Sequence, residues 1–130
     1  MAYLIDTCIL IDHLRGYVPA RDWLVSSVVG TSDDVFISVI TLTELLAGVT
    51  PRQEKPLRQL VSLMKCLGID ESIGRTTGEY LRKRRPGRGL DVPDALIAAT
   101  AKQYGLSLAT LNRRHFPMDD LSIVIPYNYS

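Results

Sequence analysis

The sequence predicts an α/β protein, in which a central parallel sheet is flanked by helices in a three-layer sandwich. Short apolar runs alternate with segments of helical spacing along the whole chain, as in parallel sheets that are covered on both faces. The 130 residues have the length of one domain, and 46% hydrophobic with 22% charged residues is ordinary for a globular protein. We therefore expect a single domain over residues 1–130.

The N-terminal part of the chain supplies the first two strands. A short apolar run ends at Asp6, and a carboxylate directly after a buried strand has few structural uses. Pro19 suits the first turn of a helix. The expected elements are, in order, a strand at residues 2–5, a helix at 8–15, a helix beginning near Pro19, a turn at 33–34 and a strand at 35–38.

The middle of the chain is predicted to be helical with one weak strand. Thr41 and Glu44 have the spacing of a capping box, so a helix is expected to start at Thr41 and to stop near Gly48. Apolar residues at helical spacing predict another helix over residues 54–67. Residues 68–69 are then a weak candidate for a strand.

The C-terminal part continues the alternation with two helices and two strands. Asp70 and Asp91 are the expected N-caps, and Gly105 suits a left-handed C-cap. Small residues in the second helix allow close packing against the sheet. The expected elements are, in order, a helix after Asp70 that ends in the basic run 82–85, a loop at 86–89, a helix from 91 to 104, a strand at 106–110 and a strand at 122–125.

Composition narrows the class of protein. No apolar run approaches the roughly 20 residues that span a bilayer, and no basic segment precedes the first apolar run, so we expect a cytoplasmic protein without a membrane segment. The net charge is only +1, so any surface that attracts nucleic acid must be local. Cys8 and Cys66 lack the spacing of a metal site or a disulfide framework, and we interpret both as core residues.

Three acids, Asp6, Glu44 and Asp94, are placed where a strand gives way to a helix or in the first turn of a helix. Those positions share one edge of a parallel sheet. Carboxylates that meet in one cleft repel each other unless a cation neutralises them, and oxygen-only ligands suit Mg²⁺ or Mn²⁺. Glu44 can instead complete the capping box, and Asp94 can simply favour a helix N-terminus with Asp91 as the cap. Spacing alone leaves both interpretations open.

Four stretches of the chain resemble the signature blocks of PIN-domain ribonucleases, most closely the VapC toxins of toxin–antitoxin pairs. The resemblance runs from Asp6 to about Phe116 in the order of the family, and the Asp94 block is the most specific. The blocks are Asp6-Thr7 after the first strand, Thr41-Leu42-Thr43-Glu44-Leu45-Leu46-Ala47-Gly48, Pro93-Asp94-Ala95-Leu96-Ile97-Ala98-Ala99-Thr100-Ala101 and Ala109-Thr110-Leu111-Asn112.

The resemblance implies a PIN-like fold with a five-stranded parallel sheet and a Mg²⁺- or Mn²⁺-dependent endoribonuclease. Asp6 and Asp94 match metal-binding acids of the family, and Glu44 matches a third acid that binds the metal directly or through water. Many relatives carry a fourth acid near the end of the fourth strand. Asn112 and His115 stand at the candidate positions here, which puts a second metal in doubt.

Basic residues next to the Asp94 block are candidates for contacts with RNA. Arg85 and Arg88 lie where flexible cations can follow a phosphate backbone, although the same run also suits a solvated helix end. Tyr127 and Tyr129 suit stacking on a base as well as packing on a partner. The candidate substrate-binding residues are Arg85, Arg88, Thr110 and Asn112, with Arg113 and Arg114 as further candidates.

The function implied by the resemblance is that of a toxin in a type II toxin–antitoxin pair, which hydrolyses RNA. The family also implies a homodimer and a small DNA-binding antitoxin as the partner. A phosphotransfer enzyme with Asp6 as nucleophile needs a second Asp two residues later, where this chain has Cys8. A catalytically weak RNA-binding or interaction module of the same fold remains an alternative, because the fourth acid is missing.

Overall fold

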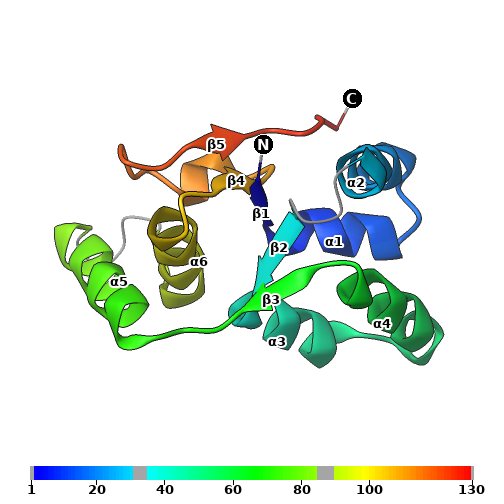
Figure 1. The fold of residues 1–130 in the computed structure, drawn as a ribbon, viewed down its shortest axis with the longest axis horizontal. Coiled ribbons are helices and arrows are strands. Elements are labelled where there is room, and N and C mark those ends of the chain that lie inside the picture. Colours follow the sequence, from blue (N-terminus) through cyan, green and yellow to red (C-terminus); the bar gives the residue numbers. More distant parts are fainter. Residues whose placement is uncertain (1, 31–34, 85–89, 130) are drawn as a thin grey trace.

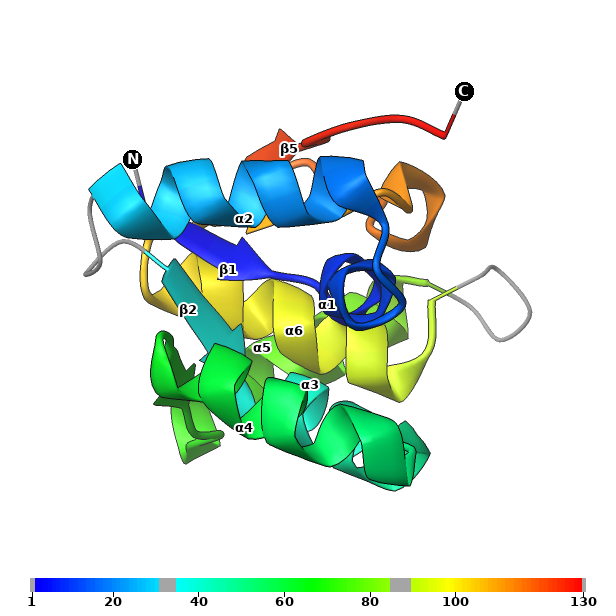
Figure 2. The ribbon, with the colours of Figure 1, turned by 90° about the vertical axis from the view of Figure 1, so that its right-hand side faces the viewer.

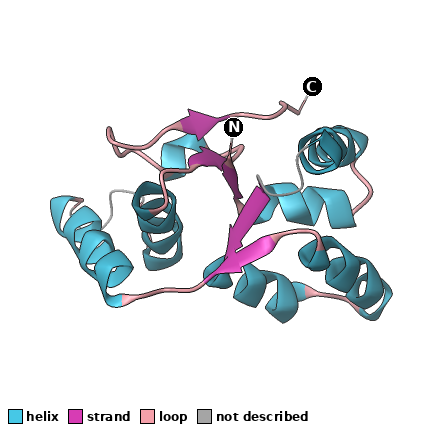
Figure 3. Cartoon of the chain, viewed as in Figure 1, coloured by secondary structure: helices cyan, strands magenta, loops and turns pink. Residues whose placement is uncertain are grey.

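A computed structural model describes residues 2–30, 35–84 and 90–129. Within these residues, five parallel strands form one sheet in the order β3-β2-β1-β4-β5 (Figure 1; Figure 3). The central strand pairs Tyr3 with Val35 on one side and with Ser107 on the other. The predicted parallel sheet is therefore confirmed. Its strands are β1 (Tyr3–Ile5), β2 (Val35–Ser38), β3 (Lys65–Leu67), β4 (Ser107–Ala109) and β5 (Ile123–Val124).

Helices connect the strands and cover both faces of the sheet. The α-helices of the described residues are α1 (Thr7–Leu14), α2 (Val18–Gly30), α3 (Val39–Gly48), α4 (Glu54–Ser62), α5 (Glu71–Lys83) and α6 (Val92–Gln103). Two short 3₁₀ turns complete the described elements: η1 (Pro51–Gln53) lies between α3 and α4, and η2 (Arg113–His115) lies between β4 and β5. No helix in the described part of the chain has the length and apolar character that crossing a bilayer requires.

Alternation along β1 divides the core between the two faces of the sheet. Leu4 packs with buried residues of α5 and α6 on one face, including Ile73 and Ala98. Ile5 packs on the other face with residues of α1, α2, α3 and α4 such as Ile9 and Leu24. Figure 1 shows α5 and α6 on one side of the strands and the other four helices across from them. Successive side chains of a strand point to opposite faces, so the three layers follow from the sequence of β1.

The start of α3 differs from the expectation. The N-cap is Ser38, whose hydroxyl accepts a hydrogen bond from the backbone N–H of Ile40 at 3.1 Å. Thr41 is fully buried inside the helix, so the predicted capping box is wrong. The first turn of a helix has free N–H groups that need an acceptor. The hydroxyl of Ser38 supplies one directly at the end of β2, before the chain reaches Thr41. Glu44 is consequently free of any capping role.

The boundary between α4 and β3 is the second difference. The helix ends at Ser62, and Lys65–Leu67 pairs with Phe36, Ile37 and Ser38 of β2, so the strand predicted at residues 68–69 lies three residues too late. The apolar residues up to Met64 have helical spacing, but the backbone pairing of Lys65–Leu67 with β2 at the edge of the sheet ends the helix before this point. Cys66 is exposed on this edge strand, which corrects its interpretation as a core residue.

Several predicted helix ends are confirmed. Asp70 accepts from the N–H of Ile73 at 2.9 Å, and Asp91 caps α6. Gly105 adopts a φ of 63° after α6, a left-handed conformation that suits glycine. The predicted turn at residues 33–34 and the loop at 86–89 lie outside the described residues.

Candidate active site

The carboxyl edge of the sheet collects the polar residues that end its central strands. Asp6 follows β1 and Thr110 follows the neighbouring strand β4, and the N–H of Asp6 donates to the carbonyl of Ala109 at 2.9 Å. Asp6 is also the N-cap of α1 and is only 6% exposed. The open end of a parallel sheet is where ligands bind in folds of this class.

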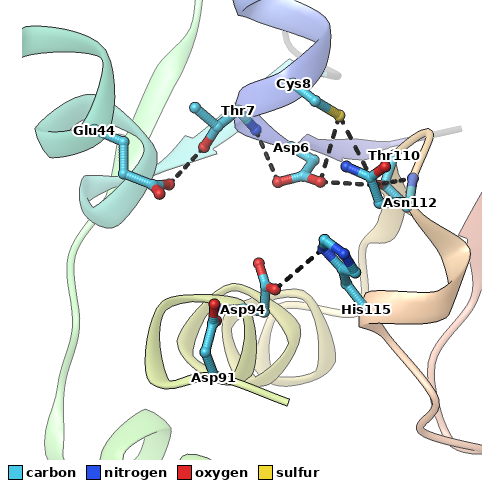
Figure 4. A network of polar contacts seen from close by, with 9 residues as sticks. All are labelled: Asp6, Thr7, Cys8, Glu44, Asp91, Asp94, Thr110, Asn112 and His115. Carbon is cyan, nitrogen blue, oxygen red and sulfur yellow. Dashed lines mark hydrogen bonds and ion pairs between the residues drawn. The ribbon is translucent and has the colours of Figure 1, made fainter. Parts of the chain in front are cut away.

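Asp6 is held by hydrogen bonds to both of its carboxylate oxygens (Figure 4). Oδ1 accepts from the N–H of Thr7 at 2.8 Å, and Oδ2 accepts from the hydroxyl of Thr110 at 2.6 Å. The thiol of Cys8 lies 3.5 Å from Oδ2, and burial, followed by the charge of Asp6, raises its pKa to about 12. Cys8 is therefore a protonated donor to Asp6 at neutral pH, and Asp6 has a fixed orientation.

Glu44 reaches the same edge from α3. Its Oε1 accepts from the hydroxyl of Thr7 at 2.7 Å, and that hydroxyl also lies 3.2 Å from Oγ1 of Thr41. Thr7 thus joins Glu44 to Asp6, since its N–H binds one acid and its hydroxyl binds the other. The side chain of Glu44 stays exposed, so its second oxygen is available to a ligand.

Asp94 approaches from the first turn of α6, where its N–H donates to Oδ1 of Asp91 at 3.0 Å. Its side chain is 19% exposed. Burial and then the negative charges of Asp91, Asp6 and Glu44 raise the pKa of Asp94 to about 7. The three predicted acids therefore lie within electrostatic reach of one another, and Figure 4 shows their carboxylates directed toward one space.

This set of groups fits a divalent cation. The groups that could bind a cation here are carboxylate oxygens. Among the described ion pairs, the basic side chain that contacts one of these acids is His115, whose Nδ1 lies 3.4 Å from Oδ2 of Asp94. No three acidic, histidine or cysteine side chains of the described ranges stand close enough to make a ligand set by themselves. Mg²⁺ usually binds one or two carboxylates and keeps several waters, so Asp6 and Asp94 suffice as direct ligands.

The two candidates for the fourth acidic position lie in different places. His115 contacts Asp94, whereas the N–H of Asn112 donates to the hydroxyl of Thr110 at 3.0 Å. Asn112 is exposed beside the site, and Thr110 is fully buried. Thr110 accepts from Asn112 and donates to Asp6, so its hydroxyl orients an acid instead of facing solvent.

Sequence reasoning missed the role of Thr7. Its position directly after Asp6 was the available signal, because the first residue of a helix can offer an N–H to the cap. Arg85 and Arg88, the predicted phosphate contacts, lie outside the described residues. Arg84, within the basic run 82–85, donates to the carbonyl of Pro117 at 2.6 Å, which ties the end of α5 to the segment before β5.

Comparison with known proteins agrees with this fold. The model of the PIN domain family matches residues 3–121. Ribonuclease VapC10 of Mycobacterium tuberculosis is 40% identical over 116 residues, which are 88% of this chain and 86% of that protein. Ribonuclease VapC1 of Rickettsia felis is 35% identical over 128 residues, or 89% of both chains.

Solved structures show the same architecture. A toxin–antitoxin complex from Klebsiella pneumoniae contains a chain with a TM-score of 0.77 and 27% identity, covering 99% of this chain and 100% of that one. DNA-bound VapBC from Salmonella typhimurium reaches a TM-score of 0.82 at 23% identity, over 95% and 97% of the two chains, and supports the fold alone. The chain therefore belongs to the PIN-domain family, among the VapC ribonucleases.

Proposed function

We propose that the chain is the toxin of a type II toxin–antitoxin pair and acts as a Mg²⁺- or Mn²⁺-dependent endoribonuclease. The observation that carries this proposal is the convergence of Asp6, Glu44 and Asp94 at one sheet edge, where burial and then the charges of Asp91, Asp6 and Glu44 raise the pKa of Asp94. Relatives at 35–40% identity are named ribonucleases, and the Klebsiella chain comes from a toxin–antitoxin complex.

Some residues of the site would bind the cation, and others orient the carboxylates that bind it. Asp6 and Asp94 would hold the ion directly, and Glu44 directly or through water. Such an ion activates a water molecule for attack on phosphorus and stabilises the charge that develops there. Thr7, Thr110 and Cys8 fix the carboxylate of Asp6 by donating hydrogen bonds to it, so that its orientation is set before a ligand arrives.

The partners follow from the same proposal. RNA is the substrate, and a small DNA-binding antitoxin would block the acidic cleft. A homodimer in the cytoplasm is the expected assembly. Arg85, Arg88 and Asn112 remain candidates for contacts with the RNA.

One observation favours a second candidate function. Asn112 and His115 replace a fourth acid, and the side chains of the described residues do not form a ligand set by themselves. A PIN-fold module that binds RNA with weak catalysis would have these features. Dependence of cleavage on added metal distinguishes the two candidates.

The test is cleavage of single-stranded RNA by the purified chain, with Mg²⁺, with Mn²⁺ and with excess chelator. We expect cleavage with either metal, none with chelator, and loss in Asp6→Asn. Asp22→Asn is the matched control, because Asp22 is exposed on α2 and pairs with Arg21. Metal-independent cleavage, or full activity in Asp6→Asn, would contradict the enzyme proposal.

A further inference from the structure

A pocket of about 250 Å³ lies directly beside Glu44, between α1 and α3. Ile11 and Leu14 of α1 form one apolar wall, and Leu45 and Val49 form the other. The two helices pack against each other on the face of the sheet that lies across from α6 (Figure 1; Figure 2). The mechanism above uses only Glu44 from the lining of this pocket.

The rim of the pocket carries a cation and an amide group that are available to a ligand. Arg15, the C-cap of α1, is exposed and forms no ion pair within the described residues. Oε1 of Gln53 accepts from the N–H of Thr50 at 3.2 Å, which leaves the amide NH₂ of Gln53 as a donor. An apolar pocket with a few polar groups suits a flat ring, and a cation beside it suits a phosphate attached to that ring.

We propose that this pocket binds one unpaired base of the RNA next to the bond that is cut, with Arg15 on the adjoining phosphate. The proposal rests on the function given above and adds a substrate subsite to it. Single-stranded RNA is commonly recognised through splayed bases that enter pockets or stack on side chains. The volume is below the ~300 to 1,000 Å³ of pockets for drug-sized ligands, and therefore suits a single ring system.

The connection to the acids supports RNA over a protein segment as the occupant. Glu44 lines the pocket and is joined through Thr7 to Asp6, so a bound base lies one side chain away from the cleavage site. Arg15 adds positive charge at the rim close to an acidic cluster that would otherwise repel a phosphate. Position and charge both match a nucleotide that continues from the scissile phosphate.

Gly48 offers a way to obstruct the pocket without disturbing the fold. It lines the pocket at the end of α3, and a Cβ added there meets no atom within 4 Å. Gly48→Phe is therefore the test variant. Gly74→Phe is the matched control, since Gly74 lies in α5 away from the pocket and its added Cβ also meets nothing within 4 Å. Thermal unfolding confirms that both variants fold.

The experiment digests a random-sequence single-stranded RNA pool with Mg²⁺ or Mn²⁺ and sequences the product ends. We expect the wild type and Gly74→Phe to share a base preference at one position beside the cut. Gly48→Phe should lose that preference and cut about 10-fold more slowly or worse, the lower end of what one pocket contributes to discrimination. An unchanged rate and base profile in folded Gly48→Phe overturn the subsite and leave the pocket to a protein partner.

Arg15→Ala tests the phosphate contact separately. Binding of the same RNA pool should weaken across all sequences, and the salt dependence should flatten by about one unit for the lost contact. Arg75→Ala on α5, where Arg75 pairs with Glu71, is the control and should change neither. An unchanged salt slope in Arg15→Ala overturns the phosphate assignment. Absence of any metal-dependent cleavage by the wild type overturns the proposed function itself, which separates the two failures.

Discussion

Ionisation of Asp94 costs stability in the metal-free fold. Its carboxylate is half-buried, faces Asp91, Asp6 and Glu44, and has a pKa raised to about 7. Three donors contact the carboxylate of Asp6. Removing the charge of Asp94 should therefore relieve its repulsion with these neighbouring acids.

We predict that Asp94→Asn stabilises the metal-free protein in a pH-dependent manner. In the unfolded chain Asp94 loses its proton near pH 3.8, but in the folded chain it keeps the proton to about pH 7. Stability of the wild type therefore falls between about pH 4 and 7 as the unfolded state binds fewer protons. The advantage of Asn should be absent near pH 4, grow up to pH 7 and stay constant above it.

Chemical unfolding at several pH values with chelator present measures this difference. The advantage of Asn should shrink when saturating Mg²⁺ is added at pH 8, because the wild type then gains more stability from binding than the variant does. A pH-independent difference would show that the pKa of Asp94 is not raised in the folded protein.

We predict that the hydroxyl of Thr110, and not its methyl group, fixes the orientation of the Asp6 carboxylate. Thr110→Val keeps the shape of this fully buried side chain but leaves Oδ2 of Asp6 without its closest donor. We expect a loss of about 1 to 3 kcal/mol in the free energy of unfolding and a marked loss of cleavage. Thr110→Ser, which retains the hydroxyl, should preserve activity far better. Equal activity in the two variants would exclude an orienting role for the hydroxyl.

Which residues reach the site was predictable, whereas how they are held was not. The positions of Asp6 and Asp94 follow from the rule that parallel strands end at one edge, which needs only the order of the elements. The contacts of Thr7 and Thr110 depend on side-chain torsions that the spacing of residues does not determine. His115 was one of two candidates for the fourth position, and only the structure shows that it contacts Asp94.

At the scale of elements, short pieces of structure were the hardest to predict. β3 has three residues with an exposed face at the sheet edge, so its sequence lacks the alternation of a half-buried strand. α3 begins at Val39, directly after the last residue of β2, so no turn residue marks the boundary. The longer helices α5 and α6 were predicted well, since their aspartate caps and apolar faces agree.

We predict that Ser38→Ala destabilises the protein by about 1 kcal/mol, the usual cost of losing an N-cap. Ser38 is fully buried, and its hydroxyl accepts from the N–H of Ile40. Thr43→Ala is the control on the same helix, where the hydroxyl bonds back to the carbonyl of Val39 on an exposed surface. Urea denaturation of both variants measures the difference. A larger loss in Thr43→Ala would argue against Ser38 as the cap.

At the scale of the whole molecule, the C-terminal tail is fastened to the first helix. The hydroxyls of Tyr127 and Tyr129 both donate to Oδ2 of Asp12, and their rings pack against Tyr17 at centroid distances of 5.6 and 5.5 Å. Tyr127 and Tyr129 thus pack within the chain. The tail follows β5, so it lies at the same edge of the sheet as the acids.

Asp12→Ala is predicted to release this tail. Chymotrypsin cleaves after tyrosine, so limited digestion should remove the end of the variant faster than that of the wild type. The free energy of unfolding should fall by about 1.5 kcal/mol, the lower range for hydrogen bonds to a charged group. Asp22→Ala on α2 is the control and should digest as the wild type does. Equal digestion of Asp12→Ala would mean that the tail is held by ring packing alone.

The most direct test of the central claim is a calorimetric titration of Mg²⁺ and Mn²⁺ at pH 8, where Asp94 is ionised. The claim is that Asp6 and Asp94 bind one divalent cation between β1 and α6. We predict that Asp6→Asn and Asp94→Asn each weaken binding at least tenfold relative to the wild type, since hard cations favour charged oxygen ligands. Asp22→Asn should bind as the wild type does. Equal affinity of all four proteins for both metals would contradict the account.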